Sequence, residues 1–275
     1  DNAYFKNDNQ TLFGDTLFYD RKNGYGKAIN NISIVDTSNN YTIYGGKAEY
    51  FESLDSSIIT IEPLFVADFD DDTLFLHSDT IIANLDSLKH KQIKTLKGAK
   101  FYSQNLQGKC QKLIYYMRDS TFQMYEEPIL WSDNYQLTSE QIILEVQKNS
   151  IDKMNLLQNA FIISEDSLGL YNQIKGRDMI GLFKRNELYK INVIGNGQAA
   201  YVVKDDENKI SGVNTVNCSK MNIYVDKKEI RRISFQKQPN STIYPLEELP
   251  KKWKRLEGFK ERYNERIVEK ENIWD

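Results

Sequence analysis

Cysteine, histidine and proline are scarce in this sequence, and each shortage excludes a class of protein. The 275 residues include 2 Cys, 2 His and 5 Pro. Two thiols, Cys110 and Cys218, cannot frame a disulfide scaffold, and no Cys-x-x-Cys pair suggests a zinc ribbon or a redox site. We favour two unpaired thiols over a disulfide between them.

Long apolar runs and excess positive charge are also missing. No run of 18 apolar residues occurs, so no membrane-spanning helix is expected. The net charge of −3 lacks the basic footprint of a nucleic-acid-binding protein, and we expect no nucleic-acid partner. Residues 1–5 already resemble a strand, which suggests a trimmed chain, so the missing signal peptide does not indicate a compartment.

Asparagine and aspartate take the place of the usual turn residues. Gly and Pro total 19 (14 and 5), whereas Asn and Asp total 46 (25 and 21), beside 17 Tyr. Asn and Asp favour turns, and Tyr favours strands. The composition therefore predicts many short strands joined by polar turns.

An internal repeat organises these strands. Seven copies of a strand-turn-strand unit begin with a small residue, at spacings of 31, 33, 32, 29, 37 and 42 residues. The heads are Gly14, Gly45, Ser78, Cys110, Ser139, Gly176 and Cys218. Three and five residues after each head lie two apolar columns, which a period of two places on one face of each strand. The first column is Leu17, Ala48, Ile81, Leu113, Ile142, Met179 and Met221; the second is Tyr19, Tyr50, Ala83, Tyr115, Leu144, Gly181 and Ile223. This pattern predicts an all-β sandwich, jelly roll or solenoid over residues 1–246.

The last 29 residues, 247–275, form a charged segment in which a short helix could start near Lys260. The cluster Lys251 to Arg255 surrounds Trp253, and it could contact phosphates or a membrane surface. Acidic neighbours dilute its field, so we favour a solvated terminal segment.

Other motifs do not support a catalytic, metal or cofactor site. Gly195 to Ala200 matches G-x-G-x-x-A but continues as a strand, so we interpret it as a β-turn. Asp68, Asp70 and Asp72 begin like a calcium loop, but the required Gly and Glu are missing, which favours an exposed acidic hairpin tip. His77 and His90 belong to no recognisable constellation. We expect no enzyme activity; a carbohydrate-active β-sandwich with two carboxylates is an open alternative.

The repeat resembles the unit of the OstA-like family, which belongs with the lipopolysaccharide-transport proteins LptA, LptC and the N-terminal domain of LptD. It looks closest to the OstA-like proteins of Bacteroidetes. The residues that carry the resemblance are Gly14–Ala28, Asp72–Thr80, Tyr171–Gly176 and Asn240–Pro245. The cysteine pattern that joins LptD's periplasmic domain to its barrel is missing.

The resemblance implies an antiparallel β-jellyroll, or open β-sandwich, whose two sheets enclose an apolar groove for the acyl chains of lipid A. It also implies a periplasmic location and edge-to-edge stacking with other Lpt-type jellyrolls or with itself. From the apolar columns we choose as groove-lining residues Leu17, Tyr19, Tyr50, Leu113, Tyr115, Ile142 and Leu144. The alternative is a structural β-repeat scaffold of the cell envelope with a filled core and no lipid cargo.

Overall fold

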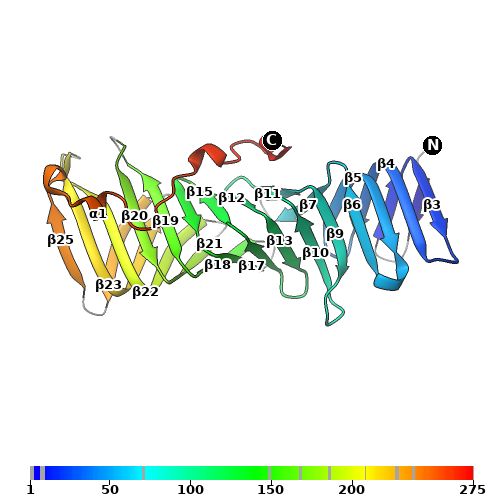
Figure 1. Cartoon of the computed structure of the whole chain (residues 1–275), viewed down its shortest axis with the longest axis horizontal. Coiled ribbons are helices and arrows are strands. Elements are labelled where there is room, and N and C mark those ends of the chain that lie inside the picture. Colours follow the sequence, from blue (N-terminus) through cyan, green and yellow to red (C-terminus); the bar gives the residue numbers. More distant parts are fainter. Residues whose placement is uncertain are drawn as a thin grey trace. The chain divides into compact units, whose positions relative to one another are not determined.

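The structure is a computed structural model that describes residues 3–6, 10–69, 72–147, 150–166, 169–184, 187–207, 209–226, 229–236 and 239–274. The chain forms two compact units. Unit 1 contains residues 1–126, 145–150 and 267–275, and unit 2 contains residues 127–144 and 151–266. Figure 1 labels many of the strands of both.

Antiparallel strands account for nearly all of unit 1. They are β1 (Ala3–Lys6), β2 (Gln10–Gly14), β3 (Thr16–Asp20), β4 (Tyr25–Asp36), β5 (Tyr41–Phe51), β6 (Ser56–Thr60), β7 (Leu64–Phe69), β8 (Asp72–His77), β9 (Thr80–Leu85), β10 (Lys91–Leu96), β11 (Ala99–Tyr102), β12 (Gln107–Cys110), β13 (Lys112–Tyr116) and β14 (Thr121–Tyr125). A 3₁₀ turn, η1 (Glu52–Leu54), follows β5.

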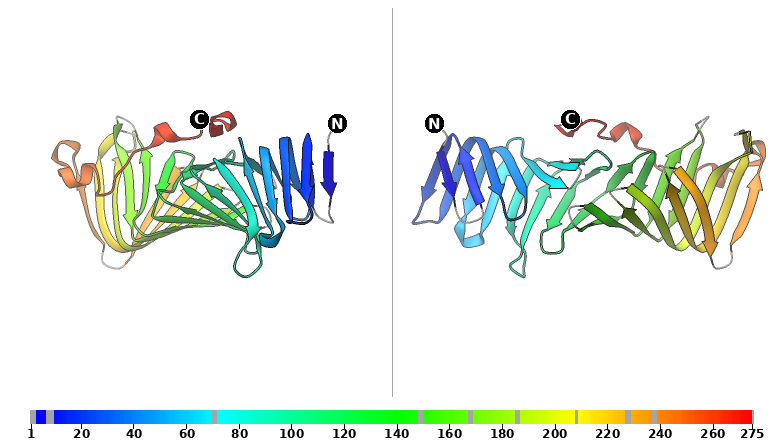
Figure 2. Two further views of the ribbon diagram at one scale, coloured as in Figure 1. Left: turned by 45° about the vertical axis from the view of Figure 1, so that its right-hand side comes forward. Right: turned by 180° about the vertical axis from the view of Figure 1, so that it is seen from behind.

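Two sheets form unit 1 because its longest strands bend between them. The first half of β4 pairs with β3 and with the second half of β5, whereas the second half of β4 pairs with β2 and the first half of β5. The first sheet continues through β6, β9, β10, β13 and β14, and the second through β7, β8, β11 and β12. Figure 2 shows these layers from two sides.

The heads of the sequence repeat lie where the chain leaves the second sheet for the first. Gly14 ends β2 before β3 begins, and Ser78 lies between β8 and β9. Gly45 occupies the bend inside β5, where a Cβ atom would lie 2.5 Å from the Cγ2 atom of Ile59. Gly176 is equally crowded, since a Cβ atom there would lie 2.4 Å from the Cγ1 atom of Val193, so these two bends leave no space for a side chain.

The return passage, from the first sheet to the second, uses pairs of consecutive residues with positive φ. These pairs are Asn30–Asn31, Ile61–Glu62, Lys97–Gly98, Glu126–Glu127, Gln158–Asn159 and Gly195–Asn196, with φ between 49° and 81°. The first residue of each pair accepts a backbone hydrogen bond from the residue that follows a repeat head. The donors are Asp15, Gly46, Asp79, Gln111, Glu140 and Arg177, at N–O distances of 2.7–3.4 Å. We call each bonded set a corner.

Aspartate side chains fix several hairpin turns at the other ends of the strands. The Asp20 carboxylate accepts hydrogen bonds from the backbone N–H groups of Lys22 and Asn23. Asp36, Asp86 and Asp205 accept equivalent bonds in their own turns. These are Asx turns. The turns after Asp36 and Asp86 contain neither glycine nor proline, whereas the turn after Asp20 also uses Gly24 at positive φ.

Unit 2 repeats the two-sheet arrangement. Its strands are β15 (Ile129–Ser132), β16 (Tyr135–Thr138), β18 (Ser150–Leu157), β19 (Ala160–Glu165), β20 (Tyr171–Gly176), β21 (Asp178–Lys184), β22 (Glu187–Lys204), β23 (Ile210–Asp226), β24 (Glu229–Gln236) and β25 (Asn240–Tyr244). The strand β17 (Gln141–Gln147) begins in unit 2 and ends in unit 1. The long strands β22 and β23 bend between the sheets, as β4 and β5 do.

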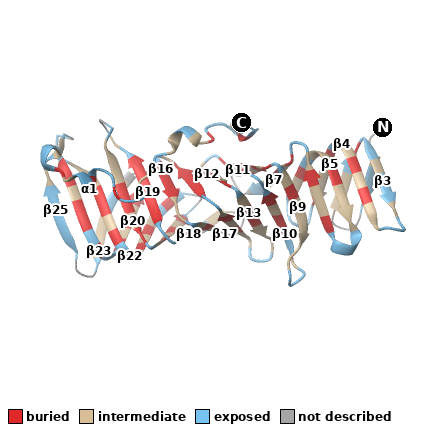
Figure 3. Cartoon of the chain, in the orientation of Figure 1, coloured by how far each residue is buried: buried red, intermediate tan, exposed pale blue. Residues whose placement is uncertain are grey.

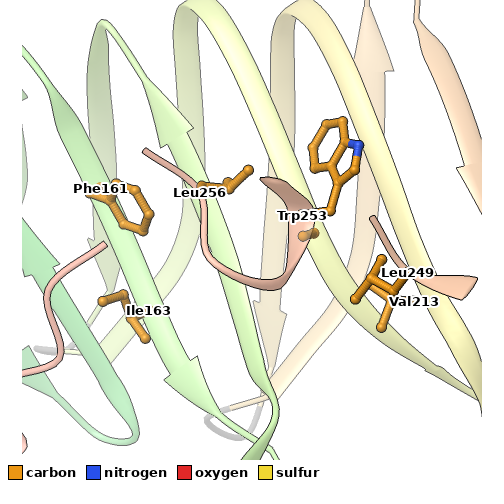
Figure 4. Packing of buried hydrophobic residues seen from close by; sticks show 7 residues of the cluster. Phe161, Ile163, Val213, Leu249, Trp253 and Leu256 are labelled. Atoms are coloured by element: carbon orange, nitrogen blue, oxygen red, sulfur yellow. The ribbon is translucent and has the colours of Figure 1, made fainter. Parts of the chain in front are cut away.

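The C-terminal segment covers the outer face of the second sheet of unit 2. It contains η3 (Leu246–Glu248), α1 (Lys251–Lys254) and η4 (Tyr263–Glu265), and η5 (Lys270–Trp274) follows in unit 1. Trp253, 6% exposed, packs with Leu249 and Leu256 against apolar residues of the sheet. Figure 4 shows this cluster, and Figure 3 marks the buried residues in red. The cluster is Phe161, Ile163, Ala200, Val213, Leu249, Trp253 and Leu256.

Two buried glutamines hold the backbone of this segment. The Gln173 amide donates to the carbonyl of Lys254 and accepts from the N–H of Leu256. The Gln136 amide does the same with the carbonyl of Lys260 and the N–H of Arg262. Each glutamine therefore satisfies polar backbone groups that the packing would otherwise bury unpaired.

The prediction of an all-β fold with antiparallel strands is confirmed. Both cysteines are free. The interpretation of Lys251 to Arg255 as solvated is wrong for Trp253, because the sheet offers an apolar surface that local charge does not reveal. Residues 195–200 lie within β22 as a bulged corner, and are not a turn between two strands. Asp70, in the predicted acidic tip, lies outside the described residues.

We predict that Ile61→Asn stabilises unit 1 by about 1 kcal/mol, because a β-branched residue is costly at positive φ and asparagine is not. Ile61 has φ 62° and is 62% exposed, so little burial is lost. Urea unfolding followed by circular dichroism measures the change. Ile243→Asn is the control, since Ile243 is 59% exposed but extended in β25. If Ile61→Asn is less stable than the unchanged protein, the backbone at Ile61 is not strained.

A second prediction concerns the C-terminal segment. Trp253→Ala should destabilise unit 2 by roughly 3–5 kcal/mol, the usual cost of removing a large buried aromatic side chain. Trp274→Ala, at a position that is 45% exposed in unit 1, should cost much less. Hydrogen exchange of β19 and β23 amides would locate the loss. Unchanged protection there would mean that the segment does not stabilise the sheet.

Candidate functional site

The first apolar column forms one continuous cross-strand row on the inner face of the first sheet of unit 1. Leu17 pairs with Ala28, and the row continues through Ala48, Ile59 and Ile81. Ala28, Ile59 and Ile81 are at most 1% exposed, but Leu17, at the N-terminal end of the row, is only half-buried. Burial of the row therefore decreases toward the edge strand β3.

The second column lies one step farther from the corners and is more exposed. Its cross-strand row runs from Tyr19 through Gly26, Tyr50 and Ser57 to Ala83. Tyr19 is 49% exposed, while Tyr50, Ser57 and Ala83 are half-buried. Small side chains between the tyrosines leave this part of the inner face less filled than the row beside the corners.

The remaining predicted lining residues are more enclosed. Leu113 in unit 1 is 1% exposed, and Tyr115 is half-buried. Ile142 and Leu144 in unit 2 are 0% and 4% exposed. The structure brings Leu17, Tyr19 and Tyr50 onto one accessible face, and it places Leu113, Ile142 and Leu144 in closed cores. Their role in binding remains a prediction.

The second sheet of unit 1 presents a matching apolar row. It runs through Leu12, Ile34, Ile43, Phe65, Leu76 and Phe101 in cross-strand register. Ile43, Phe65 and Leu76 are fully buried, whereas Leu12 and Ile34 near the N-terminal edge are half-buried. Both sheets therefore lose burial toward the same edge.

Aromatic rings in contact join the two sheets in the middle of unit 1. Phe65 of the second sheet lies between Tyr41 and Tyr115, at centroid distances of 5.3 and 6.1 Å. Tyr115, on the first sheet, stacks on Phe122 at 4.2 Å. These rings occupy the space between the sheets, so the interior is filled at this level.

A buried carboxylate lies beside these aromatic rings, next to Tyr41. Asp36 of β4 is 1% exposed and its Oδ2 atom lies 3.3 Å from the Nζ atom of Lys91, which belongs to the first sheet. Gln10 donates a hydrogen bond of 2.9 Å to the same carboxylate. The ion pair therefore ties the second sheet to the first, and we call it the Asp36–Lys91 clasp.

The hydrogen bonds around Asp36 control its ionisation. Burial alone would raise the pKa of its carboxyl, but hydrogen bonds from the turn and from Gln10, together with the Lys91 ammonium, hold that pKa well below its usual range. The pKa of Tyr41 is raised by burial and then by the Asp36 charge. Asp36 is therefore ionised near neutral pH, and its hydrogen bonds and ion pair stabilise the fold.

The two histidines make structural contacts. The His77 Nδ1 atom lies 2.9 Å from the carbonyl oxygen of Pro63, and its ring packs on Trp274 at 4.4 Å. Burial lowers the pKa of His77. His90 lies 3.5 Å from Asp86. In the described part of the chain, no group of three or more His, Cys, Asp or Glu could hold a metal ion.

The sequence did not reveal the clasp. Asp36 precedes the polar run Thr37 to Asn40, which resembles the exposed turn after Asp20. Its partners Gln10 and Lys91 are 26 and 55 residues away. Only the register of both sheets brings them together.

Comparison with known proteins gives similarities to solved structures alone. No protein-family model and no curated protein matches the chain. Among solved structures, the chain is similar to LptH, the LptA-homologous periplasmic component of the lipopolysaccharide transport device of Pseudomonas aeruginosa. The identity is 9% and the TM-score 0.34, over 41% of this chain and 80% of that one. No helix of the described residues is long and apolar enough to cross a membrane.

We predict that Asp36→Asn destabilises unit 1 by about 1–3 kcal/mol at pH 7, because charge-assisted hydrogen bonds and the clasp are weakened. Since the folded pKa is depressed, the carboxylate's contribution is full above the ordinary value of about 3.9 and is lost as the pH falls below it. The variant's deficit should therefore shrink in acid. Urea unfolding between pH 3 and 7 measures this. Asp20→Asn, in an exposed Asx turn, is the matched control and should show a smaller effect; equal effects would contradict the clasp.

Proposed function

We propose that this protein is a periplasmic lipopolysaccharide-binding and transport domain that shields lipid A acyl chains between its two β-sheets. One observation carries the proposal. The facing apolar rows of unit 1 are buried in the middle and half-buried at the N-terminal edge, at Leu17 and Tyr50 on one sheet and at Leu12 and Ile34 on the other. Apolar surface of both sheets is thus accessible at one edge.

Burial of acyl chains would provide the binding energy. Each methylene removed from water contributes about 0.8 kcal/mol, so a few chains bind firmly without charge contacts. A net charge of −3 is compatible with this mode, in which the anionic headgroup stays outside. The proposal assigns the protein no catalytic residue and no cofactor.

Open strand edges support a place in a bridge between the inner and outer membranes. In the described part of the chain, β1 and β3 each pair with one strand in unit 1, and β24 and β25 each pair only with β23 in unit 2. Unpaired edges attract further strands. We propose that other Lpt-type jellyrolls, or further copies of this chain, add to them.

The alternative function is a structural scaffold of the cell envelope without lipid cargo. The aromatic rings from Tyr41 to Phe122 and the Asp36–Lys91 clasp favour it, because protein side chains already fill the middle of unit 1. Native mass spectrometry of protein purified from envelopes separates the two. Co-purifying lipopolysaccharide supports transport, and a lipid-free mass supports the scaffold.

Photo-crosslinking tests the site directly. Benzoylphenylalanine at Tyr19 or Tyr50 should capture lipopolysaccharide in cells, because both side chains face the other sheet. Phe18 and Glu49 are the matched controls on the opposite face of the same strands; Phe18 is 57% exposed and Tyr19 49%.

Efficient capture at Tyr19 and Tyr50 with background capture at the controls is the expected result. Capture that is equal on both faces, or absent from both, would refute the proposed groove. Expression and β-sheet circular dichroism of each variant would verify that the replaced positions still fold.

A further inference from the structure

A polar cavity of about 660 Å³, widely open to solvent, lies in unit 2 beside its corners and apart from the apolar interior. Its size is within the range of small-molecule sites. Lining residues come from β20, β22, β23, β25 and two corners, and include Asn159, Lys175, Arg177, Gln198, Asn217 and Asn240. This lining contains two cations and no carboxylate.

Strand register builds the floor of the cavity. Lys175 of β20 pairs with Gln198, Gln198 with Asn217, and Asn217 with Asn240 of β25. These four polar side chains thus form one row across four strands. The Gln198 side-chain amide donates to the side-chain Oδ1 atom of Asn217 at 3.0 Å, which fixes the orientation of both side-chain amides.

The two cations are positioned by groups outside the lining. The Arg177 Nε atom donates to Asp178 at 2.8 Å, and among the described residues its two terminal nitrogens have no hydrogen-bond partner. The Lys175 Nζ atom donates to the Glu257 carbonyl at 2.9 Å. A guanidinium held through Nε presents its remaining N–H groups as a fork that suits a phosphate.

The chemistry of the lining defines a ligand class. Carboxamides both donate and accept hydrogen bonds, as sugar hydroxyls require. Without aromatic residues the lining offers no stacking surface for a nucleobase. We propose that this cavity binds a phosphorylated sugar, with the phosphate on Arg177 and Lys175 and the hydroxyl groups on the amide row.

Calorimetric titration of the full chain tests the site with glucose 1-phosphate as the probe, at 0.15 M salt. Inorganic phosphate and glucose are the separate arms. We expect saturable binding of glucose 1-phosphate that is at least tenfold tighter than that of either arm. No saturable binding, or equal affinity for inorganic phosphate, would overturn the proposal.

Variants then assign the contacts. Arg177→Gln should weaken binding of the probe about tenfold, and Asn240→Ala by roughly two- to tenfold, as expected for one charged and one neutral hydrogen bond. Arg118→Gln is the matched control, because Arg118 is also exposed and also precedes the aspartate it pairs with. An equal loss in Arg118→Gln, or no loss in Arg177→Gln, would overturn the assignment. This site does not depend on lipid in the interior, so it can hold whether or not the proposed function does.

Discussion

The corners are the constraint on which the two-sheet fold depends. At each one, two consecutive residues adopt positive φ, which for residues other than glycine costs roughly 1–2 kcal/mol each. The backbone hydrogen bond from the residue that follows a repeat head offsets about 1 kcal/mol of this conformational cost. In unit 2 Arg177 links two successive corners, because its carbonyl accepts from Ala160 and its N–H donates to Gly195, so one corner helps to align the next pair of strands. Packing of the inward columns must offset the rest, which explains why those columns are nearly continuous.

Half of this arrangement could be predicted from the sequence. Where the chain passes from the second sheet to the first, the repeat heads are small residues. The spacing of these residues revealed the repeat and both apolar columns. The return passage was not predicted, because its residues share only a backbone conformation. Ile61–Glu62 and Glu126–Glu127 contain no turn-forming residue themselves, although Pro63 and Pro128 follow them directly, whereas Asn30–Asn31 contains two. Positive φ at isoleucine is imposed by the neighbouring corners, not by local preference.

The abundance of Asn and Asp has two structural causes. Asparagine occupies corners, where it tolerates positive φ, and aspartate caps hairpin turns through its carboxylate. Sequence alone cannot separate Asp20 from Asp36, since both begin polar turns. Their difference arises from position: Asp36 lies between two sheets, near Gln10 and Lys91, and must be satisfied there because an unpaired buried charge is costly.

The filled middle of unit 1 limits where a lipid could enter. The contacting rings of Tyr41, Phe65, Tyr115 and Phe122 fill this space, and the Asp36–Lys91 clasp satisfies its buried charge, so an acyl chain gains little by displacing them. Toward β3, by contrast, small residues separate Tyr19 and Tyr50, and apolar surface is already in contact with water. Covering that surface lowers the free energy whether the cover is an acyl chain or the edge of another jellyroll. Transport and assembly would therefore compete for the same edge, unless a docked neighbour continues both apolar rows and lets the lipid pass along them.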